Sequence, residues 1–361
     1  MTLHSFRRGL RARLSLSTAG VMGACAAGLL LAATLVPQVR AEVVTGASTT
    51  GDIAYAVPSA LASKSLLLDS AHAGSRIVAV GEFGHIIMSD DDGKTWVQAE
   101  KVPTQATLTS VVFVDDKLGY AGGHDTTILR TEDAGKTWKL VFHDPESETP
   151  IMSVWFENAD HGFAMGAFSF VIETKDGGTT WEQRPLTEGD TDDFHLNKVF
   201  SDKDGEIYVA AEFGIVYHST DHGVTFEKIQ TPYEGSFWGG VSLNDGSILV
   251  FGMRGNVFRS TDKGITWTKS ETDSEQSVTG GTQLSNGTVV VTGLQGYLGF
   301  STDEGKTFKA VTLADRLSYT SIAEAGPDSI AVFGDSGARV TPNNAAAAQE
   351  AVGSKLAATG S

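Results

Sequence analysis

Two glutamates and two arginines are the residues of this chain that could act together chemically. Glu82 and Glu212 each stand in a Gly/Ala-x-x-Gly turn, and paired carboxylates are the groups that hydrolyse glycosidic bonds. Arg254 stands in another such turn and Arg316 follows a later repeat; arginines bind a partner's carboxylates through forked hydrogen bonds. Asp335 stands in the last turn of this type. These residue types point either to a glycan-active site or to a protein-binding surface.

A second set of carboxylates belongs to a motif, Ser/Thr-x-Asp-x-Gly-x-Thr-Trp/Phe, that occurs six times. The copy that contains Asp90-Asp91-Asp92-Gly93 suggests calcium, but an EF-hand loop needs more oxygen ligands and a terminal glutamate. Most copies offer only one or two carboxylates. We therefore expect the motif aspartates to hold turns through hydrogen bonds and to bind no metal. They are Asp91, Asp133, Asp176, Asp221, Asp262 and Asp303.

The spacing of this motif predicts the architecture. Successive motif aspartates are separated by 42, 43, 45, 41 and 41 residues, a period that accommodates one four-stranded sheet per repeat. A further turn, Gly334-Asp335-Ser336-Gly337, follows without a motif after it, so the seventh unit is cut short. We predict an all-β fold, a seven-bladed β-propeller over residues 64–342.

The second unit shows the expected order of elements. Alternating apolar residues predict strands at 108–114, 120–122, 127–130 and 137–142. The Asp motif then lies in the hairpin between the third and fourth strands. The Gly-x-x-Gly turns and the links between blades lie on the opposite face, where propellers usually bind ligands. This assignment puts Glu82, Glu212, Arg254, Arg316 and Asp335 on that opposite face.

Residues 1–41 read as an export signal. Four arginines precede Leu14–Val36, which carries no charge, and Val39-Arg40-Ala41 offers a small residue at the cleavage site. The uncharged stretch is long enough that an uncleaved membrane anchor is the alternative. Cleavage would leave a soluble protein in the periplasm or the thylakoid lumen.

The two ends of the mature chain raise the question of how the ring of blades closes. Within the N-terminal segment 42–63, residues 52–58 could supply the strand that the seventh unit lacks; a mobile linker is the alternative. The Ala-rich tail, residues 343–361, is expected to be flexible or a frayed helix.

Charge and cysteine content exclude some functions. The formal net charge is −17, and it becomes −22 once residues 1–41 are removed. Such a surface repels nucleic acid and anionic lipid. The sole cysteine, Cys25, lies in the export signal, so the mature chain has no disulfide.

The repeats resemble those of the photosystem II stability and assembly factors of cyanobacteria and plastids. The resemblance rests on Ser110-Val111-Val112-Phe113, Gly119-Tyr120-Ala121-Gly122-Gly123 and the motif from Thr131 to Trp138, and the pattern spans about residues 64–341. It implies a seven-bladed, non-enzymatic, monomeric propeller. It also implies docking on a membrane-complex protein or assembly intermediate, with peripheral membrane association compatible with that role.

An Asp-box glycoside hydrolase is the alternative, because sialidases share the motif. A sialidase needs three arginines that clamp a carboxylate, a tyrosine paired with an acid, and an early Arg-Ile-Pro strand. Only Arg254 and Arg316 are suitably placed, and Arg-Ile-Pro is missing. We therefore expect no catalytic residues and no cofactor, and a partner-binding role for Arg254, Arg316, Glu82, Glu212 and Asp335.

Overall fold

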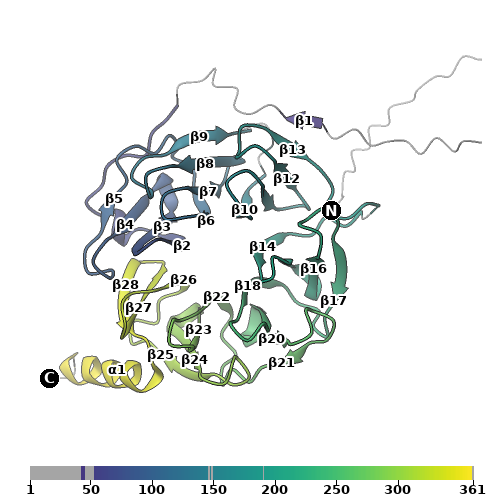
Figure 1. Ribbon diagram of the computed structural model, residues 1–361. Coiled ribbons are helices and arrows are strands. Elements are labelled where there is room, and N and C mark those ends of the chain that lie inside the picture. Colours follow the sequence, from purple (N-terminus) through teal and green to yellow (C-terminus); the bar gives the residue numbers. More distant parts are fainter. Residues whose placement is uncertain (1–41, 45–52, 145–146, 148, 190, 360–361) are drawn as a thin grey trace, which may run out of the picture. The chain divides into compact units, whose positions relative to one another are not determined.

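The structure is a computed structural model that describes residues 42–44, 53–144, 147, 149–189 and 191–359. The expected export signal, residues 1–41, lies outside these residues. From residue 53 onward the chain forms seven antiparallel sheets arranged in a circle (Figure 1). The prediction of an all-β, seven-bladed propeller is confirmed.

The first four blades use strands in chain order from the centre outward. Blade 1 contains β2 (Leu67–Ala73), β3 (Arg76–Gly81), β4 (Ile86–Ser89) and β5 (Val97–Gln98). Blade 2 contains β6 (Leu108–Phe113), β7 (Gly119–Gly123), β8 (Thr127–Thr131) and β9 (Lys139–Phe142). Blade 3 contains β10 (Ile151–Phe156), β11 (Gly162–Gly166), β12 (Val171–Thr174) and β13 (Trp181–Gln183), and blade 4 contains β14 (Leu196–Ser201), β15 (Ile207–Ala211), β16 (Ile215–Ser219) and β17 (Glu227–Gln230).

The last three blades repeat this order. Blade 5 contains β18 (Phe237–Ser242), β19 (Ile248–Gly252), β20 (Val257–Ser260) and β21 (Thr268–Lys269). Blade 6 contains β22 (Val278–Gln283), β23 (Val289–Gly293), β24 (Tyr297–Ser301) and β25 (Lys309–Thr312). Blade 7 contains three strands, β26 (Tyr319–Glu324), β27 (Ser329–Gly334) and β28 (Gly337–Pro342).

The aromatic residue that ends each Asp motif packs between neighbouring sheets. Trp138, Trp181, Phe226, Trp267 and Phe308 are all buried, and each such side chain contributes about 1.5–3 kcal/mol of hydrophobic stabilisation. These side chains tie the outer strand of each of these blades to the preceding blade.

Every inner strand carries a β-bulge after its first residue. A bulge leaves one residue without a partner in the neighbouring strand and re-aims its side chain. Here the unpaired second residue lines the central channel in all seven blades. These residues are Leu68, Thr109, Met152, Asn197, Trp238, Thr279 and Thr320.

The N-terminal segment does not complete blade 7, contrary to the sequence-based expectation for residues 52–58. Residues 53–58 lie against blade 1, where the Ala56 N–H donates to the Val102 carbonyl at 2.9 Å and Gln98 Nε2 donates to the Val57 carbonyl at 3.1 Å. β1 (Glu42–Val44) instead pairs with β13 and extends blade 3. Blade 1 offers backbone carbonyls and glutamine side chains to this segment, so the segment binds there.

The ring closes through blades 7 and 1 directly. Thr320 Oγ1 donates to the Leu67 carbonyl at 2.7 Å, and the hydroxyl oxygens of Ser70 and Ser321 lie 2.8 Å apart. Behind them Trp96 packs edge-on against Phe333, with 5.5 Å between ring centroids. Side-by-side packing of two sheets therefore replaces a shared strand.

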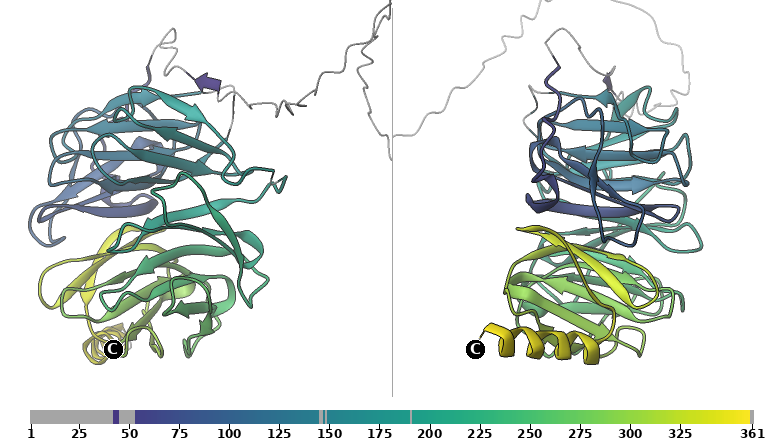
Figure 2. Two further views of the ribbon diagram at one scale, coloured as in Figure 1. Left: turned by 45° about the vertical axis from the view of Figure 1, so that its right-hand side comes forward. Right: turned by 90° about the vertical axis from the view of Figure 1, so that its left-hand side faces the viewer.

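The C-terminal tail forms helix α1 (Ala345–Thr359), where a flexible tail or frayed helix was expected. Asn344 caps it by accepting the Ala347 N–H at 3.0 Å. Helix α1 lies against blades 6 and 7 (Figure 2). Ala348 and Val352, which are one turn apart, are buried in this contact. Alanine's helix propensity and this apolar contact explain the order of the tail. No helix in the described part of the chain is long and apolar enough to span a membrane.

Candidate functional site

The Asp-box face consists of the hairpins between third and fourth strands, and the blade 2 hairpin shows its geometry. Asp133 Oδ1 accepts bonds from the Thr131 hydroxyl at 2.8 Å and from the Thr137 N–H at 2.9 Å. Asp133 Oδ2 accepts the Thr137 hydroxyl at 2.6 Å, and the Gly135 N–H donates to Thr131 Oγ1 at 3.1 Å. The other five boxes repeat this pattern.

These bonds keep the box carboxylates ionised. The Thr95 N–H and hydroxyl lower the pKa of Asp91 to about 2, and those of Thr225 lower the pKa of Asp221 to about 2. Both oxygens of each carboxylate already serve the turn. Among the residues that the structure describes, no group of three or more His, Cys, Asp or Glu side chains is arranged to hold a metal ion.

The opposite face, which we call the turn face, consists of the turns between second and third strands and the links between blades. Glu82 Oε1 accepts the Leu66 N–H at 3.0 Å, and Glu212 Oε2 accepts the His195 N–H at 2.9 Å. Asp335 makes the same bond to the Ser318 N–H at 3.2 Å. Each carboxylate thus fastens its turn to the start of its own inner strand. Across the described chain no hydrogen bond joins two of these three acids.

Two arginines on the turn face differ from the other arginines. Arg254 and Arg316 are exposed, lie in left-handed backbone with φ of 57° and 52°, and form no ion pair with any described residue. The five other described arginines all form ion pairs: Arg76, Arg130, Arg184, Arg259 and Arg339. Two guanidinium groups are therefore left for a partner on a strongly acidic protein.

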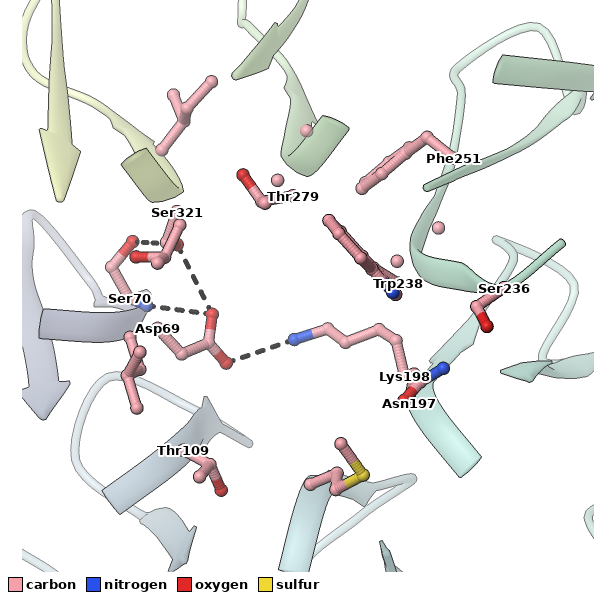
Figure 3. A pocket seen from close by; sticks show the side chains of 18 of the residues that line it. Asp69, Ser70, Thr109, Asn197, Lys198, Ser236, Trp238, Phe251, Thr279 and Ser321 are labelled. Carbon is pink, nitrogen blue, oxygen red and sulfur yellow. Dashed lines mark hydrogen bonds and ion pairs between the residues drawn. The ribbon is translucent and has the colours of Figure 1, made fainter. Parts of the chain in front are cut away.

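The central channel contains an ion pair that sequence reasoning missed. Lys198 Nζ from blade 4 lies 3.1 Å from Asp69 Oδ2 of blade 1, across a cavity of about 550 Å³ (Figure 3). Asp69 Oδ2 also accepts the Val111 N–H of blade 2 at 3.2 Å. Ser110 and Ser153 accept the equivalent N–H groups of the blades that follow them. The pair therefore braces opposite sides of the ring.

The bulge residues that line the channel are of two kinds. Thr109, Asn197, Thr279 and Thr320, at the bulge position, each donate to a carbonyl of the next blade's inner strand. The equivalent Leu68, Met152 and Trp238 carry no oxygen acceptor or hydroxyl and line the cavity with Phe251 (Figure 3). Aligning the inner strands on the repeat would have revealed these departures.

The fold and its two faces define an Asp-box β-propeller with seven blades. Residues 132–234 match the model of a family described as photosynthesis system II assembly factor YCF48. This match confirms the resemblance stated from the repeats over the residues that it covers. No curated protein matches the sequence.

Solved structures agree with the fold. A structure described as "YCF48 bound to D1 peptide" has 17% identity and a TM-score of 0.63, and the match covers 78% of this chain and 95% of that one. YCF48 from Cyanidioschyzon merolae has 16% identity and a TM-score of 0.60, with 80% and 98% covered. The WD40 propeller domain of Doa1 also has 16% identity and a TM-score of 0.60, with 81% and 97% covered. At these identities the likeness concerns the fold alone.

Proposed function

We propose that this protein is an exported, non-enzymatic propeller that binds a subunit or assembly intermediate of a membrane protein complex, as an assembly or stability factor. The observation that carries the proposal is the match of residues 132–234 to an assembly-factor family. A peptide-bound structure of a YCF48 protein supports it, because a propeller of this fold there holds a segment of a partner.

The turn face is the proposed docking surface, with Arg254 and Arg316 as its charged anchors. Both side chains are exposed and make no ion pair within the described residues. A guanidinium group offers forked hydrogen bonds to carboxylates of a partner. Glu82, Glu212 and Asp335 contribute to the same surface by fixing the turns that surround it.

Capture of the client tests this proposal. Membranes of the source organism are crosslinked with wild-type protein and with the double variant Arg254→Glu/Arg316→Glu, and the captured subunits are identified by mass spectrometry. The double variant should lose capture because both anchors then repel carboxylates. Lys94→Glu/Lys136→Glu, an equal charge reversal at exposed residues of the Asp-box face, is the matched control and should capture normally. Capture retained by the arginine variant would refute the assignment of this surface.

A glycan-active enzyme is the competing function, and the hydrogen bonds of its candidate carboxylates argue against it. Glu82 and Glu212 each accept a backbone N–H in their own blade. Wild-type protein should therefore not turn over a sialoside or a β-glucan. Turnover that disappears in Glu82→Gln or Glu212→Gln would overturn the non-enzymatic proposal.

Export places the proposed monomer in the periplasm or the thylakoid lumen, where it reaches the membrane through its client. The basic start, the uncharged core and Val39-Arg40-Ala41 motivate this step. Mass analysis should find Glu42 at the mature N-terminus in a soluble fraction. An intact Met1 in the membrane fraction would replace this view with a membrane-anchored protein.

A further inference from the structure

Three turns on the turn face hold a phenylalanine in a position that costs stability. Phe83, Phe168 and Phe213 have φ of 58°, 56° and 55°, a left-handed conformation that is strained for a bulky residue. Their side chains are also 60%, 62% and 56% exposed. Glycine or asparagine would relieve both costs. Strain and exposure mark these three turns as candidates for binding, and the surroundings of each ring decide which of them bind.

The two faces differ in what they expose. The exposed aromatic residues of the described chain are Tyr55, Phe83, Phe168 and Phe213. The three phenylalanines lie in turn-face hairpins, and the Tyr55 carbonyl accepts a bond from Gln105 in a turn-face link. Exposed aromatic residues that gather on one face are typical of sites of protein association.

Two of the three phenylalanines each contact an aromatic ring of the link between blades 3 and 4. The Phe168 ring lies 5.2 Å from the His195 ring, and the Phe194 ring lies 5.0 Å from the Phe213 ring. Phe194 and His195 are consecutive, and the Ser169 N–H donates to the Phe194 carbonyl at 2.8 Å, so both ring pairs lie where the turn of blade 3 meets the link to blade 4. We call these four residues the aromatic patch. His195 also lines the mouth of the central channel.

Acidic residues border this patch. Ser169 Oγ donates to the Asp192 carbonyl at 2.8 Å, which fixes the link before β14 beside Phe168. This link carries the exposed acids Glu188 and Asp193, and neither forms an ion pair with a described residue. One cation lies in the patch, because Lys228 Nζ is over the Phe194 ring at 4.8 Å, but it is paired with Asp192 of the same link. The aromatic patch therefore combines apolar anchoring with the acids Glu188 and Asp193, which are unpaired among the described residues. The link beside Phe83 carries one acid, Glu100, and one lysine, Lys101, which lies over the Tyr55 ring at 5.8 Å.

We propose that the aromatic patch binds a segment of the partner protein that carries an aromatic or aliphatic side chain flanked by lysine or arginine. This inference rests on the proposed function and sharpens it. The turn face carries charges of opposite sign, with acids beside blade 3 and arginines in blade 5 and before blade 7. A partner with the complementary charges can dock in one orientation only.

The first test removes the patch without disturbing the turns. Asparagine tolerates positive φ, so Phe168→Asn/Phe213→Asn should keep or raise the melting temperature while client capture falls about tenfold or more. Phe83→Asn is the matched control, since it changes the same turn position on blade 1, and it should capture normally. Capture retained by the double variant, or lost equally in Phe83→Asn, would overturn the proposal.

The second test uses peptides and does not depend on the client. A short fluorescein-labelled peptide of Phe, Lys and Gly should bind wild-type protein by fluorescence anisotropy, more weakly at high salt. Replacing its Lys with Glu or its Phe with Ala should abolish binding, as should Phe168→Asn/Phe213→Asn in the protein. Equal or tighter binding of the Glu peptide would overturn the proposal.

Other occupants of the patch are outcomes of the same experiments. If wild-type protein binds phosphatidylglycerol vesicles through Phe168 and Phe213, the patch binds a lipid surface. If it forms a dimer that substitution of these residues breaks, the patch binds a second copy of this chain. Either result would overturn the proposed partner segment. If wild-type protein captured no client but bound the Phe-Lys peptide, the proposed function would fail and the patch assignment would stand. If it bound neither, both would fail.

Discussion

The Asp-box face and the turn face are built from the same repeat, but they have diverged to different degrees. On the Asp-box face six hairpins satisfy their own carboxylates, hydroxyls and amides in one repeated pattern. On the turn face the equivalent turn position holds Phe83, Asp125, Phe168, Phe213, Arg254 and Gln295 in successive blades. The repeat is uniform where it holds the fold and variable where a partner would be recognised. The following predictions test that division.

The largest effect is expected at Glu173, which lies between blades 3 and 4 toward the Asp-box face. This buried carboxylate accepts bonds from His161 Nε2 at 3.0 Å and Arg184 Nη1 at 3.1 Å. Glu173→Ala would leave Arg184 without its carboxylate and His161 with Glu157 alone, and it should cost roughly 3 kcal/mol of unfolding free energy in urea titration. Exposed Glu227→Ala is the control. A cost at Glu173 as small as at Glu227 would show that the cluster does not hold these blades together.

The next effect concerns a single Asp box. Asp133→Ala leaves the Thr137 N–H without its acceptor and should cost about 1–3 kcal/mol, with or without calcium. Client capture should not change. Asp116→Ala, which removes an exposed acid from the β6–β7 hairpin, is the matched control. Calcium-dependent stabilisation of the wild type that vanished in Asp133→Ala would give the boxes a metal-binding role.

A smaller effect should appear in how the contribution of His161 to stability depends on pH. Hydrogen bonding to Glu173 and Glu157 raises the pKa of His161 above 6.5, although burial opposes the shift. Because the folded pKa is raised, the stabilisation is complete below pH 6.5 and is lost as the pH rises through the folded value. The unfolding free energy of the wild type minus that of His161→Asn should therefore decrease as the pH rises. A difference that is independent of pH, or one that grows on the alkaline side, would contradict the arrangement.

The smallest effect should have the opposite sign and belongs to the turn face. Phe83→Asn relieves a bulky residue at φ 58° and should leave the unfolding free energy unchanged or raise it by up to about 1 kcal/mol. The same substitution type on the Asp-box face, Trp138→Asn, should be strongly destabilising because Trp138 is buried. A marked loss of stability in Phe83→Asn would mean that the exposed ring supports the fold.

The sequence predicted the parts of this fold that repeat locally. The 41–45-residue period predicted the seven blades, and the strands of the second unit lie within about two residues of their observed bounds. The contact of residues 53–58 with blade 1 and the packing of α1 were missed. These contacts join parts of the chain that periodicity does not relate.

The candidate site was predicted only in outline. The alternation of apolar and polar residues placed the five partner-binding candidates in turns and links. It could not indicate that Glu82, Glu212 and Asp335 accept backbone N–H groups. The Asp69–Lys198 pair spans 129 positions in sequence, so spacing carried no sign of it. Phe168 and Phe213 were visible in their turns, but their exposure became apparent only in three dimensions.

The central claim, that the turn face binds the client and the Asp-box face does not, is tested most directly by site-specific crosslinking. A photoreactive benzoylphenylalanine replaces either Phe213 on the turn face or Ile265, which is 79% exposed in the Asp box of blade 5. After irradiation with membranes of the source organism, the protein labelled at Phe213 should be linked to the client, and the protein labelled at Ile265 should not. A client crosslink formed from Ile265 and absent from Phe213 would contradict the account.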